Sequence, residues 1–155
     1  MRAMLLLAIS LFCTTLWAQG TAPASSPWTL KDQFDQAFTL DAKTRVLIIA
    51  RSFSSARLVN SAIEDRPKGF LEDRGVAFVA DIEMMPTIAK AVMVPAMRSA
   101  SYRILLDRDG SVASRYAGDR DTVQWLELGP DGVAREQRFN DIGSLRQALA
   151  GLAYR

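Results

Sequence analysis

The apolar residues of this chain form short runs separated by turn residues, which is the pattern of an α/β domain. Two continuous apolar runs, at residues 45–50 and 76–80, are rich in branched side chains and predict strands buried on both faces. Between them, apolar residues at 58, 59, 62 and 63 have helical spacing. This order predicts a right-handed βαβ unit with parallel strands.

The segments around this unit predict further strands. Alternating pieces at residues 28–30 and 37–40 suggest an N-terminal β-hairpin. Residues 102–106 predict a strand, with a turn at 107–110 and a return at 111–116. Residues 122–128 and 133–139 predict another hairpin around a Gly-Pro-Asp-Gly turn. The pattern leaves open whether 102–116 or 122–139 closes the sheet.

Two more helices are expected. Residues 85–94 predict one, with Pro86 near its start and Pro95 at its end. Asn140 or Asp141 can cap the other, whose apolar stripe has spacings of three and four residues. The overall order predicts an α/β sandwich with a mixed sheet, helices on both faces and an N-terminal hairpin. The stripe of the last helix consists of Ile142, Leu145, Leu149 and Leu152.

The N-terminus has the layout of a secretory signal peptide. Arg2 precedes a mostly apolar run at residues 4–16, and Ala18 offers a small residue before a cut. The run is shorter than the roughly 20 apolar residues of a membrane-spanning helix. We therefore expect a cleaved signal at 1–18, a flexible leader at 19–27 and a single domain at 28–155. The protein is expected to be periplasmic or secreted, without stable membrane insertion after cleavage.

Composition excludes several kinds of chemistry. The 155 residues include no histidine, which removes Ser-His and Cys-His catalysis and histidine metal sites. The only cysteine, Cys13, lies in the predicted signal, so the exported form would have no thiol. A net charge of +2 gives no case for a nucleic-acid partner.

The element order resembles the thioredoxin-like superfamily. The opening hairpin at 30–40, the strand and helix that begin at 45 and 55, and the segments at 122–136 and 144–149 carry the resemblance. It implies a three-layer thioredoxin-like sandwich over nearly the whole mature chain. In that superfamily the reactive cysteine lies at the start of the helix after the first core strand.

This sequence departs from the superfamily at the positions that decide activity. Residues 51–57 read Arg-Ser-Phe-Ser-Ser-Ala-Arg, and a serine hydroxyl supports no disulfide exchange. The usual cis-proline is also missing before the closing hairpin, where Asp121 and Thr122 stand. The resemblance thus implies a fold and withholds the redox activity.

Two groups of residues are candidates for a ligand or partner groove at the carboxyl ends of the strands. At the helix start, hydroxyls, backbone N–H groups and guanidiniums suit a carboxylate or phosphate, although helix capping and solvated arginines explain them too. Carboxylates near 81 can bind a cation or cap a helix. The candidates are Arg51, Ser52, Ser54, Ser55, Arg57, Asp81, Glu83 and Pro86.

Methionines form a third candidate. Thioethers are soft ligands for Cu(I), but methionines also fill irregular core gaps and adaptable partner surfaces. Four of the six methionines fall in one segment: Met84, Met85, Met93 and Met97.

The expectation for function is a non-catalytic module that binds a protein or peptide and holds no cofactor. One alternative is an oxidoreductase with a bound cofactor such as a flavin, although no nucleotide-binding motif supports it. Another is a Cu(I)-handling module. A deep polar crevice above Arg51 and Asp81 would indicate an enzyme, and a shallow apolar groove would indicate a docking surface.

Overall fold

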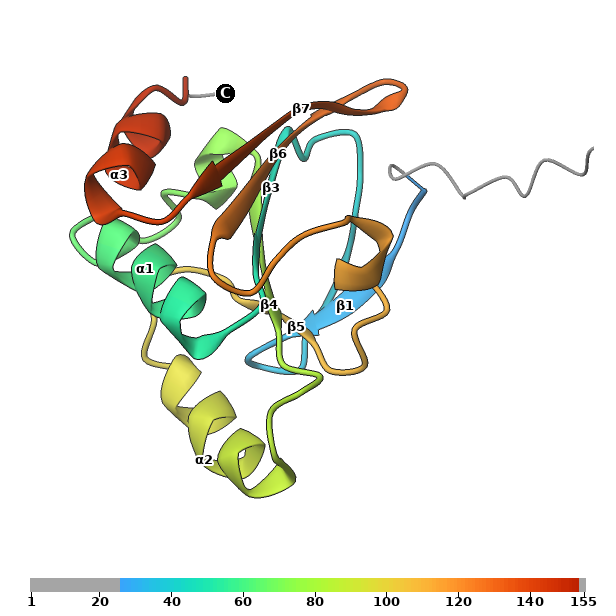
Figure 1. Cartoon of the computed structure of the whole chain (residues 1–155), viewed down its shortest axis with the longest axis vertical. Helices are drawn as coiled ribbons and strands as arrows, with labels where there is room; N and C mark the ends of the chain where they lie inside the picture. The colour runs from blue at the N-terminus through green and yellow to red at the C-terminus, as the bar shows by residue number, and fades with distance from the viewer. Residues whose placement is uncertain (1–25, 154–155) are drawn as a thin grey trace, which may run out of the picture.

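A computed structural model describes residues 26–153. The predicted signal peptide and most of the predicted leader lie outside the described residues. Seven strands form one sheet in the order β2-β1-β5-β4-β3-β6-β7 (Figure 1). The strands are β1 (Thr29–Asp32), β2 (Ala37–Thr39), β3 (Val46–Ala50), β4 (Val76–Asp81), β5 (Leu105–Asp107), β6 (Val123–Gly129) and β7 (Gly132–Phe139).

Three α-helices and two 3-10 turns complete the described chain. The sequences of the α-helices explain why they form. α1 and α3 have apolar stripes and polar caps, whereas α2 has apolar residues around most of its circumference. They are α1 (Phe53–Ile63), η1 (Glu72–Arg74), α2 (Thr87–Met97), η2 (Ala113–Arg115) and α3 (Ile142–Ala150).

The sheet is mixed, as the sequence predicts. β3 pairs with β4 in parallel, from Val46 opposite Val76 to Ala50 opposite Ala80. β4 also pairs with β5 in parallel, and β1 and β6 run antiparallel to their central neighbours. The predicted N-terminal hairpin is confirmed as β1 and β2. The hairpin of β6 and β7 closes the sheet.

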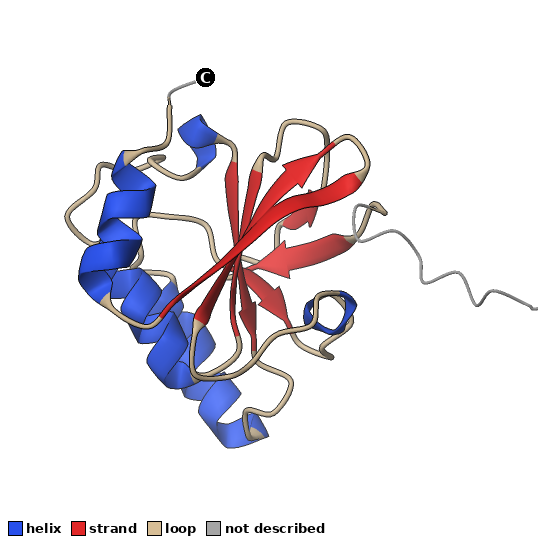
Figure 2. Ribbon diagram, turned by 45° about the horizontal axis from the view of Figure 1, so that its top comes forward, coloured by secondary structure: helices blue, strands red, loops and turns tan. Residues whose placement is uncertain are grey.

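The two faces of the sheet are covered differently. Alternate residues of β3, such as Ile48, pack with α1, α2 and α3 on one face. The other face, with Leu47 and Ile49, packs against Trp28, the loop after β5 and η2. Figure 2 shows all three α-helices on one side of the strands and the short η2 on the other. The prediction of helices on both faces is therefore met only in part, because all three α-helices lie on one face and the other carries the short 3-10 helix η2.

The alternative hairpin at 102–116 is wrong. After β5 the chain does not return as a strand but crosses the second face and forms η2. The Asp107 side chain explains this path, because its Oδ2 accepts the N–H groups of Val112 at 3.0 Å and Ala113 at 2.7 Å. These bonds hold backbone that would otherwise need a strand partner.

The helix predicted at 85–94 begins and ends later. α2 spans Thr87–Met97, so Pro95 lies inside the helix rather than at its end. A proline removes one N–H and disturbs the helix before it, but residues after it can still complete the final turn. The N–H of Arg98 accordingly reaches the carbonyl of Pro95 at 3.2 Å.

The cap and the centre of the last helix match the prediction, but the helix ends at Ala150, so Leu152 of the predicted stripe lies beyond it. Asp141 is the N-cap, and its Oδ1 accepts the N–H of Ser144 at 2.8 Å. Leu145 and Leu149 are fully buried against α1 and the sheet, whereas Ile142 is exposed. Within residues 26–153 no helix has the length and apolar character needed to cross a membrane.

Candidate functional site

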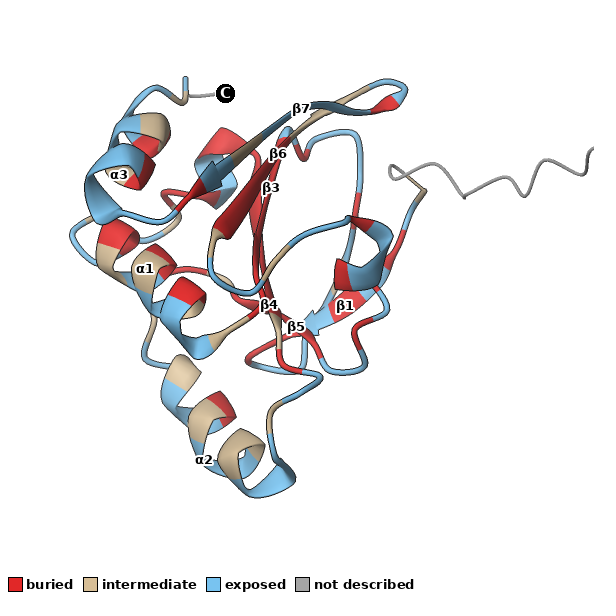
Figure 3. Ribbon diagram, viewed as in Figure 1, coloured by how far each residue is buried: buried red, intermediate tan, exposed pale blue. Residues whose placement is uncertain are grey.

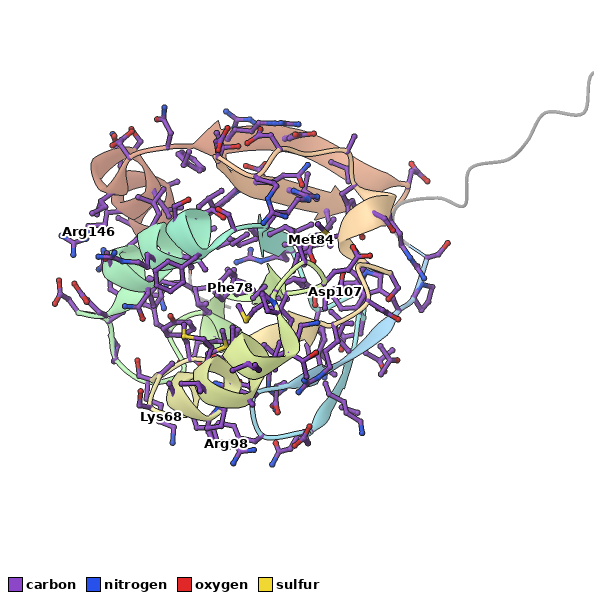
Figure 4. All side chains as sticks on the ribbon, turned by 60° about the horizontal axis from the view of Figure 1, so that its bottom comes forward. Lys68, Phe78, Met84, Arg98, Asp107 and Arg146 are labelled. Atoms are coloured by element: carbon purple, nitrogen blue, oxygen red, sulfur yellow. The ribbon has the colours of Figure 1, made fainter. Side chains whose placement is uncertain are left out.

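The carboxyl ends of the parallel strands place the candidate residues at one edge of the sheet. Arg51 follows β3, Asp81 ends β4, and Asp107 ends β5 opposite Asp81. Ligand sites of open α/β sheets lie beyond such strand ends. Figure 4 views this region from the side of α2, with Asp107 and Met84 labelled close to the same end of that helix.

The serines at the start of α1 cap the helix. Ser52 Oγ accepts the N–H of Ser55 at 3.1 Å, and the N–H of Ser52 reaches Ser55 Oγ at 3.0 Å, which together form a capping box. Ser52 Oγ also lies 2.6 Å from the carbonyl oxygen of Arg120, to which it donates. Ser54 Oγ lies 2.9 Å from Ser52 Oγ. These bonds tie the helix start to the loop before β6.

Arg51 points away from solvent and braces the loop that covers the second face. Its Nη2 donates to the carbonyl oxygens of Ala113 at 3.0 Å and Tyr116 at 2.6 Å. Burial lowers the pKa of Arg51, an effect that the nearby Asp81 carboxylate opposes. Because carbonyls and carboxylates surround this guanidinium, its arrangement suits bracing the loop better than binding an anion.

Close packing reinforces this brace at Gly118. A Cβ at this position would collide with Arg51 Nη1 and lie 2.8 Å from Gln124 Oε1. Both atoms are buried and find no hydrogen-bond partner among the described residues. Gly118 thus lets the loop lie directly over the guanidinium.

Asp107 holds the same loop from the end of β5. The side chain is fully buried, and burial raises the pKa of Asp107, against the two N–H bonds from Ala113 and Val112. Arg51 and Asp107 therefore bind opposite sides of one backbone segment: the guanidinium takes its carbonyls, and the carboxyl group takes its amides.

The loop before β6 is held by a third acid. The side chain of Asp119 accepts the N–H of Thr122 at 2.8 Å and that of Asp121 at 2.9 Å, and it pairs with Arg138 on β7. The hydrogen bonds from the backbone and side chain of Thr122 contribute most to lowering the pKa of Asp119 from 3.8 to about 2. This network fixes Arg120, whose carbonyl bonds to Ser52.

An apolar groove opens beside this edge, between α1 and α2. Its larger pocket has a volume of about 450 Å³ and its smaller pocket about 240 Å³. Five residues line both pockets: Phe53, Ala56, Ala80, Met93 and Met97. Phe53 is 57 % exposed although it is aromatic. Phe78 of β4 lies on the floor, and Figure 4 labels it between the two helices.

The structure gathers most of the candidate residues around this groove. Ser54 and Ser55 bond to the capping residue Ser52 and line neither pocket. Glu83 also lines neither pocket and lies beside Gly110. Arg57 lines the larger pocket, and its guanidinium lies 5.8 Å from the Phe53 ring centroid. The smaller pocket is lined by Arg51, Ser52, Asp81, Pro86 and all four candidate methionines, Met84, Met85, Met93 and Met97.

Sequence reasoning missed the aromatic and small residues of the groove. Phe53 and Ala56 lie one turn apart on α1, where they read as ordinary helix residues. Arg120 was missed because it lies in a loop far from α1 in sequence. The one signal in the sequence for this surface was Phe53, an aromatic residue directly after the serine that caps the helix.

Comparison with solved structures gives the fold. A putative thiol:disulfide interchange protein DsbE from Chlorobium tepidum is similar at a TM-score of 0.55 and 18% identity, covering 83% of this chain and 95% of that one. MTB dsbF gives 0.56 and 16%, covering 84% and 98%. A putative thioredoxin from Neisseria meningitidis gives 0.52 and 17%, covering 83% and 88%. No family model and no curated protein matches the chain.

The chain has a thioredoxin-like fold. The resemblance read from the element order is thereby confirmed at the level of fold. Within this thioredoxin-like fold, the turn from β3 into α1 carries Arg51, Ser52 and Phe53, and their contacts are a loop brace, a helix cap and a groove wall. The interpretation of residues 51–57 as an anion site stays a prediction.

The contacts of Arg51 and Arg57 predict unequal contributions of these two arginines to stability. We expect Arg51→Met to lower the free energy of unfolding by about 3 kcal/mol, because it removes two hydrogen bonds from a charged group to buried carbonyl oxygens. Arg57→Met should cost less than about 1 kcal/mol, since an exposed cation–π contact is weak. Urea unfolding of both variants measures the difference, and equal losses would contradict the brace.

The Asp119 network predicts a dependence on acid. Because the folded pKa lies below 3.8, this carboxylate stabilises the fold above about pH 4 and loses that contribution as the pH falls toward 2. We expect Asp119→Asn to lower the melting temperature at pH 7 and to reduce its fall between about pH 4 and pH 2. Asp131→Asn, in the turn between β6 and β7, is the matched control. A fall as steep as that of the unchanged protein would refute this role of Asp119.

Proposed function

We propose that this chain is an exported, non-catalytic thioredoxin-like domain that binds a protein or peptide segment in the groove between α1 and α2. The observation that carries the proposal is the lining of the groove. The residues common to both of its pockets are Phe53, Ala56, Ala80, Met93 and Met97, which supply apolar contact surface and no nucleophile. An open apolar groove is the form expected of a docking surface.

The groove suits a segment with bulky apolar side chains. Covering one such side chain contributes about 1.5–3 kcal/mol, and the larger pocket offers about 450 Å³. Methionine side chains are flexible and polarisable, so they adapt to partners of different shape. Burial raises the pKa of Tyr102 on the groove wall to about 12, above the ordinary value at which a tyrosine is already neutral at physiological pH. That hydroxyl donates to Asn60 Oδ1 at 2.8 Å.

The sequence supports export and the absence of thiol chemistry in the proposed role. Cys13 is the only cysteine and lies within the predicted signal peptide. Ser52 stands at the helix start where thiol-dependent members place their reactive sulfur, and its hydroxyl is engaged in the cap. Binding, rather than electron transfer, is therefore the activity that these residues serve.

Peptide binding provides the test. Twelve-residue peptides selected from a random library on the full chain should be rich in apolar residues and bind with micromolar dissociation constants. We expect Met93→Glu to weaken binding at least about tenfold, because the carboxylate would be desolvated in the groove. Val92→Glu, one residue away on the outer side of α2, should leave the affinity unchanged. Equal effects of the two variants, or selected peptides without apolar residues, would refute the proposal.

A second candidate function, Cu(I) binding, is favoured by one observation. Met84, Met85, Met93 and Met97 all line the smaller pocket, so the fold brings the four thioethers to one place. Thioethers are ligands that Cu(I) prefers. We expect a Cu(I) site here to resist a competing chelator and to be lost in Met93→Leu. Full removal of Cu(I) by a chelator of micromolar affinity would exclude this candidate and leave the docking groove intact.

A further inference from the structure

Helix α2 carries an apolar face that nothing in the described chain covers. Its only charged residue is Lys90, whose Nζ lies 3.3 Å from the carbonyl oxygen of Glu83 and 3.5 Å from that of Arg108. Val94 is its only buried residue, and Ile88 and Val92 are 83 % and 66 % exposed. Figure 3 shows α2 as exposed or half-buried along most of its length.

This outer face adjoins the groove and shares only Ala96 with its lining. The side of α2 that faces α1 carries Met93 and Met97, which line the pockets. Ile88 and Val92 line neither pocket and lie one helical turn apart on the other side. A helix that is apolar on both sides is normally buried on both, so the outer side requires its own partner. The outer face is formed by Ile88, Ala91, Val92, Pro95 and Ala96.

We propose that this face is covered by α2 of a second copy of the chain, in an antiparallel pair related by a two-fold axis near Val92. Around that axis Val92 meets its own copy, and the large Ile88 falls opposite the small Ala96. Large side chains opposite small ones let two helices approach closely. A two-fold contact needs one patch that is complementary to itself, and this face meets that condition.

Charges select the antiparallel arrangement. Glu83 precedes the N-terminus of α2 and Arg98 is its C-cap, so the two lie at opposite ends of an 11-residue helix. Figure 4 shows the helix between Met84, which neighbours Glu83, and Arg98. An antiparallel pair brings Glu83 of each copy near Arg98 of the other, whereas a parallel pair would bring like charges together. Arg98 pairs with the exposed Asp35 at 3.8 Å and donates to the carbonyl of Gln33 at 2.9 Å, and about half of its side chain stays exposed.

A membrane surface fits less well, because helices that lie on membranes carry several basic residues on their polar face, and here Lys90 is bonded to carbonyl oxygens.

Sedimentation equilibrium of the full chain tests the pairing. A single helix pair is small beside the interface of roughly 1,600 Å² that is typical of stable complexes, so we expect a dimer with a dissociation constant of about 10–100 µM. Val92→Glu should raise that constant at least about tenfold, because it places two carboxylates together at the axis. Val133→Glu on β7, another partly exposed valine, should not change it.

A charge exchange tests the geometry. We expect Glu83→Arg alone and Arg98→Glu alone each to weaken the dimer about threefold or more, and the double variant to recover most of that loss. The two residues lie too far apart in one chain to contact each other, so recovery reports contact between copies. A chain that stays monomeric up to about 1 mM, or that binds lipid vesicles instead, overturns the proposal. Failure here leaves the groove proposal standing, because Met93 and Val92 face different sides of α2.

Discussion

The placement of the partly buried segment at residues 112–116 depends on one donor side chain and one acceptor side chain at the carboxyl edge of the sheet. Arg51 takes its carbonyl oxygens and Asp107 takes its amides. Leaving such groups unpaired in the interior would cost about 1–3 kcal/mol each. This segment covers the second face of the sheet, and its exit toward β6 carries Arg120 to the start of α1. Contacts within the chain therefore hold the carboxyl edge of the sheet in place.

The contacts at this edge also engage the polar residues at the start of α1. Ser52 and Ser55 bond to each other and to the backbone, so the start of α1 satisfies its own amides. Arg51 is turned inward, and Phe53 is turned toward α2. Ser52, Ser55 and Arg51 thus stabilise the fold, and the surface shared by the two pockets of the groove is apolar. Exposed apolar surfaces of that kind commonly mark interaction sites.

The sequence predicts what periodicity and local capping control. The βαβ unit, both terminal hairpin assignments at 28–40 and 122–139, and the Asp141 cap follow from runs, alternation and turn residues. The path of the chain after β5 does not follow from the sequence. It depends on hydrogen bonds that the Asp107 side chain accepts from amides five and six residues ahead, and no periodic pattern in the sequence indicates these bonds. Nor does the groove follow, since it depends on how far α2 stands from α1. Four methionines read as one cluster, but only the fold shows that they share a pocket.

The central claim is that the α1–α2 groove receives apolar segments. The most direct measurement is the NMR spectrum of methionine methyl groups in the full chain during titration with a library-selected apolar peptide. The account predicts that the Met93 and Met97 signals shift together and saturate at the stoichiometry of the complex. Saturable binding that leaves both signals unmoved would contradict it.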